Sequence, residues 1–508
     1  MDIIGSLKPL DIIRSAAKNE ITDKDEPLSP PALLFQSPQL NCCVMATMGS
    51  KTKWDANRCK MGLENTLAKH PRFSSLLVMD EGNNYTKMRW RKTKVNVDNH
   101  IFVPKIDLPK MDDPTEAADR YVEDYISDLH RTKMDYSKPL WEFHILNIQT
   151  SGASGVVVLK IHHSLGDGIS LMSSLLACTR QSSDPMMLPT LPTSTRARSH
   201  SSSKTKGVFC TFWTMLLMVF NTFVDVLLLA ATALFLKDSD TPIKGSPESG
   251  SAKKCMVHKL IDLNDVKLVK TAMNTTINDV LFGVTEAGLS RYLNGRYASK
   301  QAEKAGYQIA SKIRDFLPKG LRVRAALYVN LRASAGIEAF AKIMENETKL
   351  ESGNKFGYVL LPFEIAIRDD PLDYIRRAKA TLDRKKLSFE AVCSFAIGLF
   401  IHKLFGTKAV APLMHNIVSK TTVSFSNVVG PQEEISLYGH PLAYVAPTVY
   451  GAPQALTMHW QSCGDKMVLI LTVESDLIPD PHKLCADMEV SLNLIKDTLI
   501  KRGLITAN

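Results

Sequence analysis

One stretch near the middle of the chain limits how the rest can fold. Residues 208–236 form a run of 29 residues in which Asn221 and Asp225 are the only strongly polar side chains. About 20 consecutive apolar residues are enough to cross a bilayer. Polar stretches at 181–207 and 237–254 flank this run, and their Ser, Thr, Pro and Lys content is typical of exposed linkers. The run therefore separates two globular parts, and contact with a membrane has to be considered.

The length and composition agree with such a division. A chain of 508 residues is longer than a single hydrophobic core supports. Apolar residues make up 45% and charged residues 22%, which is typical of globular proteins and excludes a transporter with many spans. We therefore expect an N-terminal tail at 1–25, a first half at 26–180, a linker at 181–254 that holds the apolar run, and a second half at 255–508.

The net charge of +10 is spread along the chain rather than gathered in one arm. Such a mild excess permits ligands that carry phosphate, or an anionic lipid surface. It gives no reason to expect nucleic acid as a partner.

Helix and strand patterns mix in both halves, which predicts an α/β protein. Strands are predicted at 141–148, 156–161, 421–426 and 467–473, and helices at 113–129, 276–293 and 483–499. Thr276 and Asp279 are spaced as a capping box. Gly295 should end the helix that they begin.

The strongest chemical signal lies where an apolar strand of the first half ends. The strand at 156–161 runs directly into His162 and His163, and then into a turn that contains Asp167 and Gly168. A histidine in this place can be fixed by the sheet and still face a cleft. Unperturbed imidazole titrates near pH 6.5, so the neutral form dominates at neutral pH and can accept a proton from a hydroxyl group. The pattern indicates a general base.

The same residues also fit roles without proton transfer. The two histidines could be ordinary core or surface residues, since the chain has 13. A zinc site is disfavoured because neighbours on a strand point to opposite faces and no third ligand lies nearby, so we expect no metal. An Asp followed by Gly before a helix is a good N-cap. Asp167 is therefore predicted to fix the loop that presents His163 rather than to transfer a proton.

Several motifs resemble those of one enzyme family. Residues 162–168 resemble the HHxxxDG signature of acyl-CoA-dependent acyltransferases with the chloramphenicol-acetyltransferase-like fold. Five further segments resemble, in order, the motifs of the wax ester synthase/diacylglycerol acyltransferase family: 26–30 (EPLSP), 70–73 (HPRF), 139–141 (PLW), 278–280 (NDV) and 426–431 (SNVVGP). The run 413–453 is similar to the plant, WSD-type branch in particular. The resemblance covers about residues 26–500, and the DFGWG motif of the sister BAHD family is absent from the sequence.

This resemblance implies a fold and a reaction. The fold would be two pseudo-symmetric α/β domains with a central channel, with the apolar helical insert between them. His163 would be the general base, with His162 in a supporting role and Gly168 as part of the motif. It would take the proton from a fatty alcohol or from the free hydroxyl of a diacylglycerol, whose oxygen attacks the thioester of acyl-CoA. Acyl-CoA is then a substrate, and no cofactor is expected.

The resemblance does not fix the group that stabilises the oxyanion. Ser424, Ser426 and Asn427, at the end of a strand in the second half, are candidates. A purely structural role for Asn427, in a turn with Gly430, fits the pattern equally well. Asn278–Asp279 and Pro139–Trp141 are expected to be structural, and the basic run at 376–386 is expected to be a solvated helix face.

The apolar run cannot simply span the membrane if the two halves share one site. A full span would place His163 and Asn427 on opposite sides of the bilayer. An Asp near mid-bilayer would also cost about 2.5–3.5 kcal/mol. We therefore expect an element that lies in the membrane surface or re-enters it, for example two short helices bent near Asn221–Thr222. The alternative is a buried connector packed on the protein.

The implied location is the endoplasmic reticulum membrane with both halves in the cytosol, or else the plasma membrane. The first residues contain no apolar run long enough for a signal peptide, and nine cysteines without a CxxC pair fit a reducing compartment. Two other functions stay open. One is acyl transfer to a sterol or phenolic alcohol, and the other is a catalytically silent lipid-binding protein, against which the intact HHxxxDG motif argues.

Overall fold

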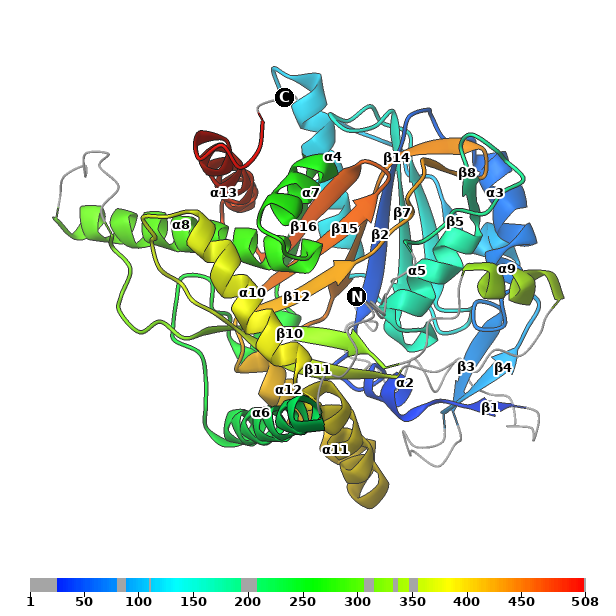
Figure 1. The fold of residues 1–508 in the computed structure, drawn as a ribbon. Coiled ribbons are helices and arrows are strands. Elements are labelled where there is room, and N and C mark those ends of the chain that lie inside the picture. Colours follow the sequence, from blue (N-terminus) through cyan, green and yellow to red (C-terminus); the bar gives the residue numbers. More distant parts are fainter. Residues whose placement is uncertain are drawn as a thin grey trace.

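The computed structural model describes residues 25–79, 88–108, 111–192, 208–305, 315–331, 337–346 and 355–506. Two mixed sheets lie at the centre of the molecule, with helices around them (Figure 1). The predicted α/β class is confirmed.

The first sheet has seven strands. Their order is β5 (Ile101–Phe102), β6 (Trp141–Leu146), β7 (Gly155–His162), β2 (Cys43–Ser50), β14 (His440–Tyr450), β13 (Ile435–Leu437) and β8 (Thr179–Gln181). A small sheet beside it has the order β1 (Glu26–Pro27), β4 (Met88–Lys92) and β3 (Ser75–Met79). The helices that belong to this half are α2 (Pro30–Leu34), α3 (Ala56–Asn65), α4 (Pro114–Leu129) and α5 (Gly168–Ala177), with 3₁₀ turns η2 (Leu67–Lys69), η4 (Val97–Asn99) and η5 (His163–Leu165).

The second sheet has six strands. Their order is β11 (Phe356–Phe363), β10 (Val323–Asn330), β12 (Val423–Val428), β15 (Leu456–Cys463), β16 (Lys466–Glu474) and β9 (Lys254–Asp262). One face of this sheet packs on α7 (Leu263–Ala272), α8 (Ile277–Ala305), α10 (Leu372–Lys386) and α13 (Pro481–Lys501). The remaining helices are α6 (Val208–Leu234), α9 (Ile337–Asn346), α11 (Glu390–Phe405) and α12 (Thr407–Ser419), with a 3₁₀ turn η6 (Pro247–Gly250).

The helix N-caps predicted from the sequence are present in the structure. The Asp113 carboxylate accepts a hydrogen bond from the backbone N–H of Thr115 and caps α4. Thr276 and Asp279 exchange side-chain-to-backbone bonds of 2.8 and 3.2 Å at the start of α8. The predicted stop at Gly295 is wrong, because α8 continues to Ala305. Beyond the glycine, the Tyr297 side chain packs against the core of the second half, which offsets the cost of about 1 kcal/mol for a glycine in a helix.

The two halves of the sequence interlock in space. β14 comes from the second half, yet it lies in the first sheet and pairs with β2 over its length, with Tyr450 opposite Cys43. Helix α9 also crosses over, and its Phe340 and Met344 pack in the core of the first half. The catalytic half suggested by the sequence is therefore completed by strands and a helix from the other one.

The polar stretches on either side of the apolar run are attached to the protein where the structure describes them. Ser182 donates a backbone hydrogen bond to Glu434, so the fold continues past Arg180. Asp238, in the second polar stretch, is buried and forms an ion pair with Arg324. Residues 193–207 of the predicted linker lie outside the described residues.

The apolar run forms one continuous helix, α6, so the bend considered at Asn221–Thr222 is wrong. Both residues face the second half instead. The Asn221 amide donates to the carbonyl of Leu387, and the Thr222 hydroxyl accepts from the backbone N–H of Phe389. Helix α6 packs beside α11 and α12 at the lower edge of the molecule (Figure 1).

A buried ion-pair cluster holds α6 in this place. Asp225 is fully buried and lies 2.9 Å from Arg384 and 3.0 Å from Lys385. Lys385 also binds the buried carboxylate of Glu390 at 2.6 Å. The most polar residue of the apolar run is thus neutralised by the protein rather than exposed to lipid.

Candidate active site

His163 lies where an interior strand of the first sheet ends. It follows β7 directly and opens η5, and its backbone N–H donates to the carbonyl of Cys42 at 2.9 Å. The imidazole is half-buried and stacks on the ring of Phe35, with 4.1 Å between ring centroids and 21° between planes. The sheet and the aromatic ring together hold this side chain in place.

His162 is the last residue of β7, is buried, and is part of a hydrogen-bond network. Its Nδ1 accepts from the backbone N–H of Ser164 at 3.2 Å and lies 3.2 Å from the side-chain nitrogen of Gln36. Its Nε2 lies 3.1 Å from the side-chain oxygen of Asn41. The Gln36 oxygen in turn accepts from the Tyr136 hydroxyl at 3.1 Å. These partners fix the neutral tautomer with its proton on Nε2.

Burial keeps both imidazoles neutral at physiological pH. Burial, with smaller effects of His163 and Lys160, lowers the pKa of His162 to about 3. Burial also lowers the pKa of His163, although backbone acceptors and the Asp167 carboxylate oppose this effect. His163 is therefore a neutral base with an anion beside it that can stabilise the protonated form.

Asp167 has the structural place that the sequence predicted. It is the N-cap of α5, and its Oδ1 accepts from the backbone N–H of Ser170 at 2.9 Å. Gly168 follows as the first residue of the helix and is exposed, and a Cβ there would meet no atom within 4 Å. The packing of the described residues thus does not require a glycine at this position.

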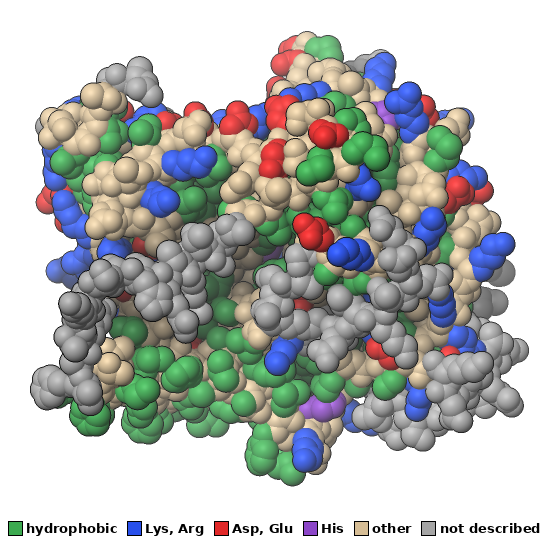
Figure 2. All heavy atoms as spheres, turned by 45° about the vertical axis from the view of Figure 1, so that its right-hand side comes forward, with side chains coloured by type: hydrophobic (Ala, Val, Ile, Leu, Met, Phe, Trp, Pro, Cys, Tyr) green, Lys and Arg blue, Asp and Glu red, His purple; other side chains and the backbone are tan. Residues whose placement is uncertain are grey.

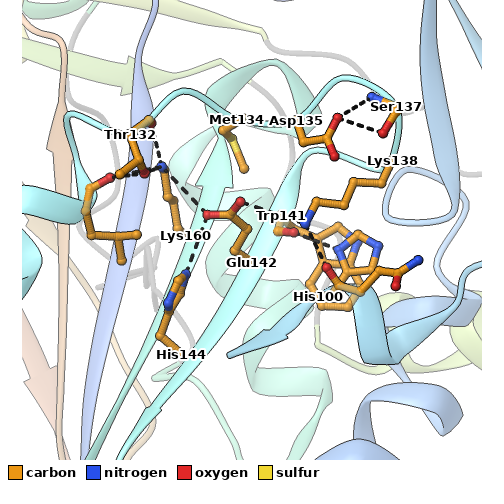
Figure 3. Close-up of polar contacts among 12 residues, drawn as sticks. His100, Thr132, Met134, Asp135, Ser137, Lys138, Trp141, Glu142, His144 and Lys160 are labelled. Carbon is orange, nitrogen blue, oxygen red and sulfur yellow. Dashed lines mark hydrogen bonds and ion pairs between the residues drawn. The ribbon is translucent and has the colours of Figure 1, made fainter. Parts of the chain in front are cut away.

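A buried lysine ties β7 to α4 (Figure 3). Lys160, two residues before His162, is fully buried, and its Nζ donates to the carbonyls of Leu129 and Thr132 at 3.0 and 2.8 Å. A cation at the carboxyl end of a helix is favoured by the helix dipole. Its Nζ also lies 3.7 Å from Glu142, whose carboxylate is 3.5 Å from the Nε2 of His144. This network fixes the position of β7 just before the two histidines.

The alternation of β12 separates the three oxyanion candidates. Phe425 belongs to the core beneath α8, so Asn427 lies on the same face as Phe425, and its amide donates to the side chain of Asn278 on α8. Ser424 and Ser426 lie on the opposite face. That face carries Tyr328 of the neighbouring β10, because Leu327 pairs with Phe425.

The same face of the second sheet approaches His163. The rings of Tyr328 and Phe356 are 5.7 Å apart, and the ring of Phe356 is 6.0 Å from that of Phe35, which stacks on His163. A row of aromatic side chains thus leads from β10 to the imidazole. Ser426, which follows Phe425, lies beside this row, whereas Asn427 lies on the other side of the sheet.

Sequence reasoning missed the residues that hold the two histidines. Phe35, Gln36 and Asn41 follow the EPLSP segment at 26–30, and α2 brings them under the end of β7. The sequence signal that could have pointed to these residues is the EPLSP motif, which stands just before an apolar turn. Among the described residues, no group of three or more His, Cys, Asp or Glu side chains is arranged to hold a metal ion.

Comparisons with known proteins identify the family. The family model described as the wax ester synthase/diacylglycerol acyltransferase catalytic domain matches residues 39–281, and the WS/DGAT C-terminal domain matches 352–496. Wax ester synthase/diacylglycerol acyltransferase 11 of Arabidopsis thaliana is 48% identical over 488 residues, which cover 95% of this chain and 97% of that protein. This chain belongs to the wax ester synthase/diacylglycerol acyltransferase family. The WS/DGAT protein 5 of the same plant is 46% identical over 501 residues and covers 97% of both chains.

Solved structures confirm the expected fold of this WS/DGAT protein. The wax ester synthase/diacylglycerol acyltransferase from Marinobacter aquaeolei VT8 matches with a TM-score of 0.56 and 16% identity, over 94% of this chain and all of that one (100%). The first condensation domain of the CDA synthetase matches with a TM-score of 0.53 and 11% identity, over 94% and 96% of the two chains. As a WS/DGAT member, the chain is an O-acyltransferase.

Proposed function

We propose that this WS/DGAT protein transfers the fatty acyl group of an acyl-CoA to the hydroxyl of a long-chain alcohol or a diacylglycerol at a membrane surface. The observation that carries the proposal is the neutral imidazole of His163, held by Phe35 at the end of β7 with the Asp167 carboxylate nearby. A binding protein has no need of a base in this place.

The proposed reaction needs no covalent acyl-enzyme. The imidazole of His163 takes the hydroxyl proton while the acceptor oxygen forms a bond to the thioester carbonyl carbon. The tetrahedral oxyanion then collapses, its carbon–sulfur bond breaks, and the CoA thiolate leaves with the proton from the imidazolium. A positioned general base contributes about 10²- to 10⁴-fold to the rate. Asp167 assists by stabilising the imidazolium that forms between the two steps.

The oxyanion needs a hydrogen-bond donor on the side of the second half. We assign this role to the hydroxyl groups on the face of the second sheet that approaches His163, namely those of Ser426 and Tyr328. Their position beside the aromatic row supports the assignment. Asn427 is disfavoured, since its amide is bound to Asn278 on the opposite face. Replacement of the donor by Ala or Phe should lower kcat more than it raises KM.

The membrane contact is assigned to a surface that we call the apolar ridge. It is made of exposed large side chains on α6 and α11: Phe212, Trp213, Met215, Leu216, Val219, Phe220, Phe223, Leu227, Ile397, Leu399, Phe400, Leu404 and Phe405. Hydrophobic side chains gather along the lower edge of the molecule in Figure 2, where Figure 1 places these helices. Helix α6 is long and apolar enough to cross a membrane, and α10 with α11 passes the same test as a bent pair.

Placement of α6 in the membrane surface agrees with its contacts better than a span does. Its inner side is bound to the second half through Asn221, Thr222 and Asp225, and its outer side is apolar. An amphipathic arrangement of this kind lies in the interface with its apolar side in the acyl region. Both halves then share one side of the membrane, which we propose is the cytosolic side of the endoplasmic reticulum or of the plasma membrane.

Turnover by purified protein in lipid vesicles tests the proposal. Labelled palmitoyl-CoA is offered with hexadecanol and with diacylglycerol, and the ester products are separated. The variant His163→Ala should lose at least 100-fold in kcat while its unfolding midpoint stays within a few degrees of the wild type. His162→Ala should lose less activity and more stability, about 1–3 kcal/mol, because it leaves buried partners unsatisfied. Full turnover by a folded His163→Ala protein would refute the assignment of the base.

A further inference from the structure

A cavity lies directly behind the apolar ridge. It has a volume of about 250 Å³ and lies between α2, β11, α6, α11 and α12. Its wall includes Leu34 of α2, Leu229 of α6 and Met414 of α12. Ile397 and Leu399, which are exposed residues of the ridge, also line it. The cavity therefore adjoins the surface that we propose faces the membrane.

Two polar side chains in the wall of this cavity, Ser394 and His402, are engaged by the protein. The Ser394 hydroxyl donates to the carbonyl of Tyr358 at 3.0 Å. The Nδ1 of His402 lies 3.4 Å from the Thr407 hydroxyl, and burial lowers the pKa of His402 below its usual value, so its ring is neutral at pH 7. An uncharged and mostly apolar cavity of this kind suits an alkyl chain and offers nothing to a phosphate group.

The inner end of the cavity lies close to the catalytic histidine. Leu34 is in the cavity wall, and the next residue, Phe35, stacks on His163 at 4.1 Å. Phe356 also lines the cavity, and its ring is 6.0 Å from that of Phe35. The Phe35–Phe356 pair thus connects the wall of the cavity with the imidazole.

We infer that this cavity binds the alkyl chain of the lipid acceptor, which enters sideways from the membrane between α6 and α11. The inference rests on the proposed function and names the place of one substrate. The acceptor is the substrate that dissolves in the bilayer, and its chain can slide along the ridge into the cavity while its hydroxyl reaches His163. Acyl-CoA carries phosphates and arrives from water, so its own chain is assigned elsewhere. Helix α6 is then a wall of the binding site as well as a membrane contact.

One glycine in the cavity wall makes a sharp test. Gly398 of α11 lines the cavity, and a Cβ there would meet no atom within 4 Å. The variant Gly398→Phe should fill the cavity without forcing the protein apart, and it also replaces a poor helix former. Gly295 of α8 has equally open surroundings but lies outside the cavity, so Gly295→Phe is the matched control. Ala230→Phe fills the cavity from the α6 side and serves as a second, independent variant.

Chain-length series for each substrate separate the two possible occupants. With palmitoyl-CoA fixed, Gly398→Phe should lower kcat/KM for hexadecanol at least 15-fold, since each methylene that loses its burial costs about fourfold. The value for butanol, whose chain is too short to need the cavity, should stay within twofold. With butanol fixed, varying the donor from octanoyl-CoA to palmitoyl-CoA should show no effect of the variant. Gly295→Phe should match the wild type in every arm.

The outcomes distinguish this inference from the proposed function. If wild-type protein forms no ester with any alcohol, the proposed function is wrong, whatever the variants do. If the wild type is active but both cavity variants lower the rates for hexadecanol and butanol equally, or neither variant changes them, the acceptor site is wrong. A loss that follows the length of the acyl-CoA chain instead would assign the cavity to the donor and overturn the inference. Binding of a fluorescent long-chain alcohol to His163→Ala protein, with and without Gly398→Phe, reads the same site without turnover.

Discussion

Replacement of Asp225 by an apolar residue distinguishes an α6 that is docked on the protein from an α6 that spans the bilayer. The replacement should destabilise the protein in the first case and favour membrane insertion in the second. In the structure, the Asp225 carboxylate accepts from both Arg384 and Lys385. The substitution Asp225→Leu keeps the number and branching of the side-chain heavy atoms and removes these bonds. If α6 instead spanned the bilayer away from the protein, the same change would remove a charged group from the apolar interior.

The expected loss of unfolding free energy follows from how deeply the two partners of Asp225 are buried. Lys385 is only 8% exposed at its side chain and keeps Glu390 as a counter-ion, whereas Arg384 is 38% exposed and can turn toward water. The loss is therefore that of one charged, buried hydrogen-bonded contact, about 1.5–3 kcal/mol of unfolding free energy. A spanning helix would gain about 2.5–3.5 kcal/mol of insertion free energy from the same substitution.

The assay is chemical unfolding in detergent micelles, together with protease protection of both halves in sealed microsomes. A double-mutant cycle with Lys385→Met should give a coupling free energy of about 1 kcal/mol or more between the two sites. Asp240→Ala is the matched control, since its side chain is 87% exposed and its ion pair with Lys237 should contribute little. A more stable Asp225→Leu protein, no coupling, or opposite protection of the two halves would refute the docked position of α6.

Three further predictions concern Asp167 and the protonation of buried histidines. Asp167→Ala should lower the unfolding free energy by about 1 kcal/mol, because the α5 cap is lost, and should also lower activity. Asp167→Asn should keep the cap. A stable but inactive Asp167→Ala protein would point to direct chemistry by Asp167 instead. Because burial lowers the pKa of His163, the acid limb of kcat/KM should lie below pH 6.5, and Asp167→Asn should move it lower still, since the carboxylate raises that pKa. His162 and His70, with pKa values lowered to about 3 and about 4 by burial, stay neutral in the native state while the unfolded chain takes up protons near pH 6.5. The free energy of unfolding should therefore be highest above pH 6.5 and fall as the pH drops toward 4. A urea midpoint that rises on acidification would contradict this prediction.

Helix-start signals in the sequence predicted local structure well, whereas the stop signal at Gly295 did not. The capping residues Asp113, Thr276 and Asp167 all cap the helices they were expected to begin, because such bonds involve neighbours within a few residues. The composition of the apolar run indicates an element suited to a membrane. Its single-helix form could not be predicted, because Asn221 and Asp225 look like breaks until their partners at the end of α10 are known.

Contacts between distant parts of the chain could not be predicted in this way. The network around His162 brings in Gln36 from 126 residues earlier in the chain, and no periodicity connects them. Asn427 and Ser426 were equal candidates in the sequence, and only the pairing of β12 with β10 and the contact with α8 show which of their two faces approaches His163. The crossing of β14 into the first sheet has no local signature either, since its strand pattern fits any sheet.

The pairing of β14 with β2 also determines when the first sheet can be completed during synthesis. Ser50 at the end of β2 is hydrogen-bonded to Pro441, 391 residues later in the chain. At about 5–20 residues per second, the ribosome needs roughly 20–80 seconds to supply the missing neighbour. During that time β2 presents an open edge beside the strand that leads to His163, and an open edge can pair with another chain. The first half is therefore expected to need protection by chaperones during synthesis, and neither half should fold correctly when it is expressed alone.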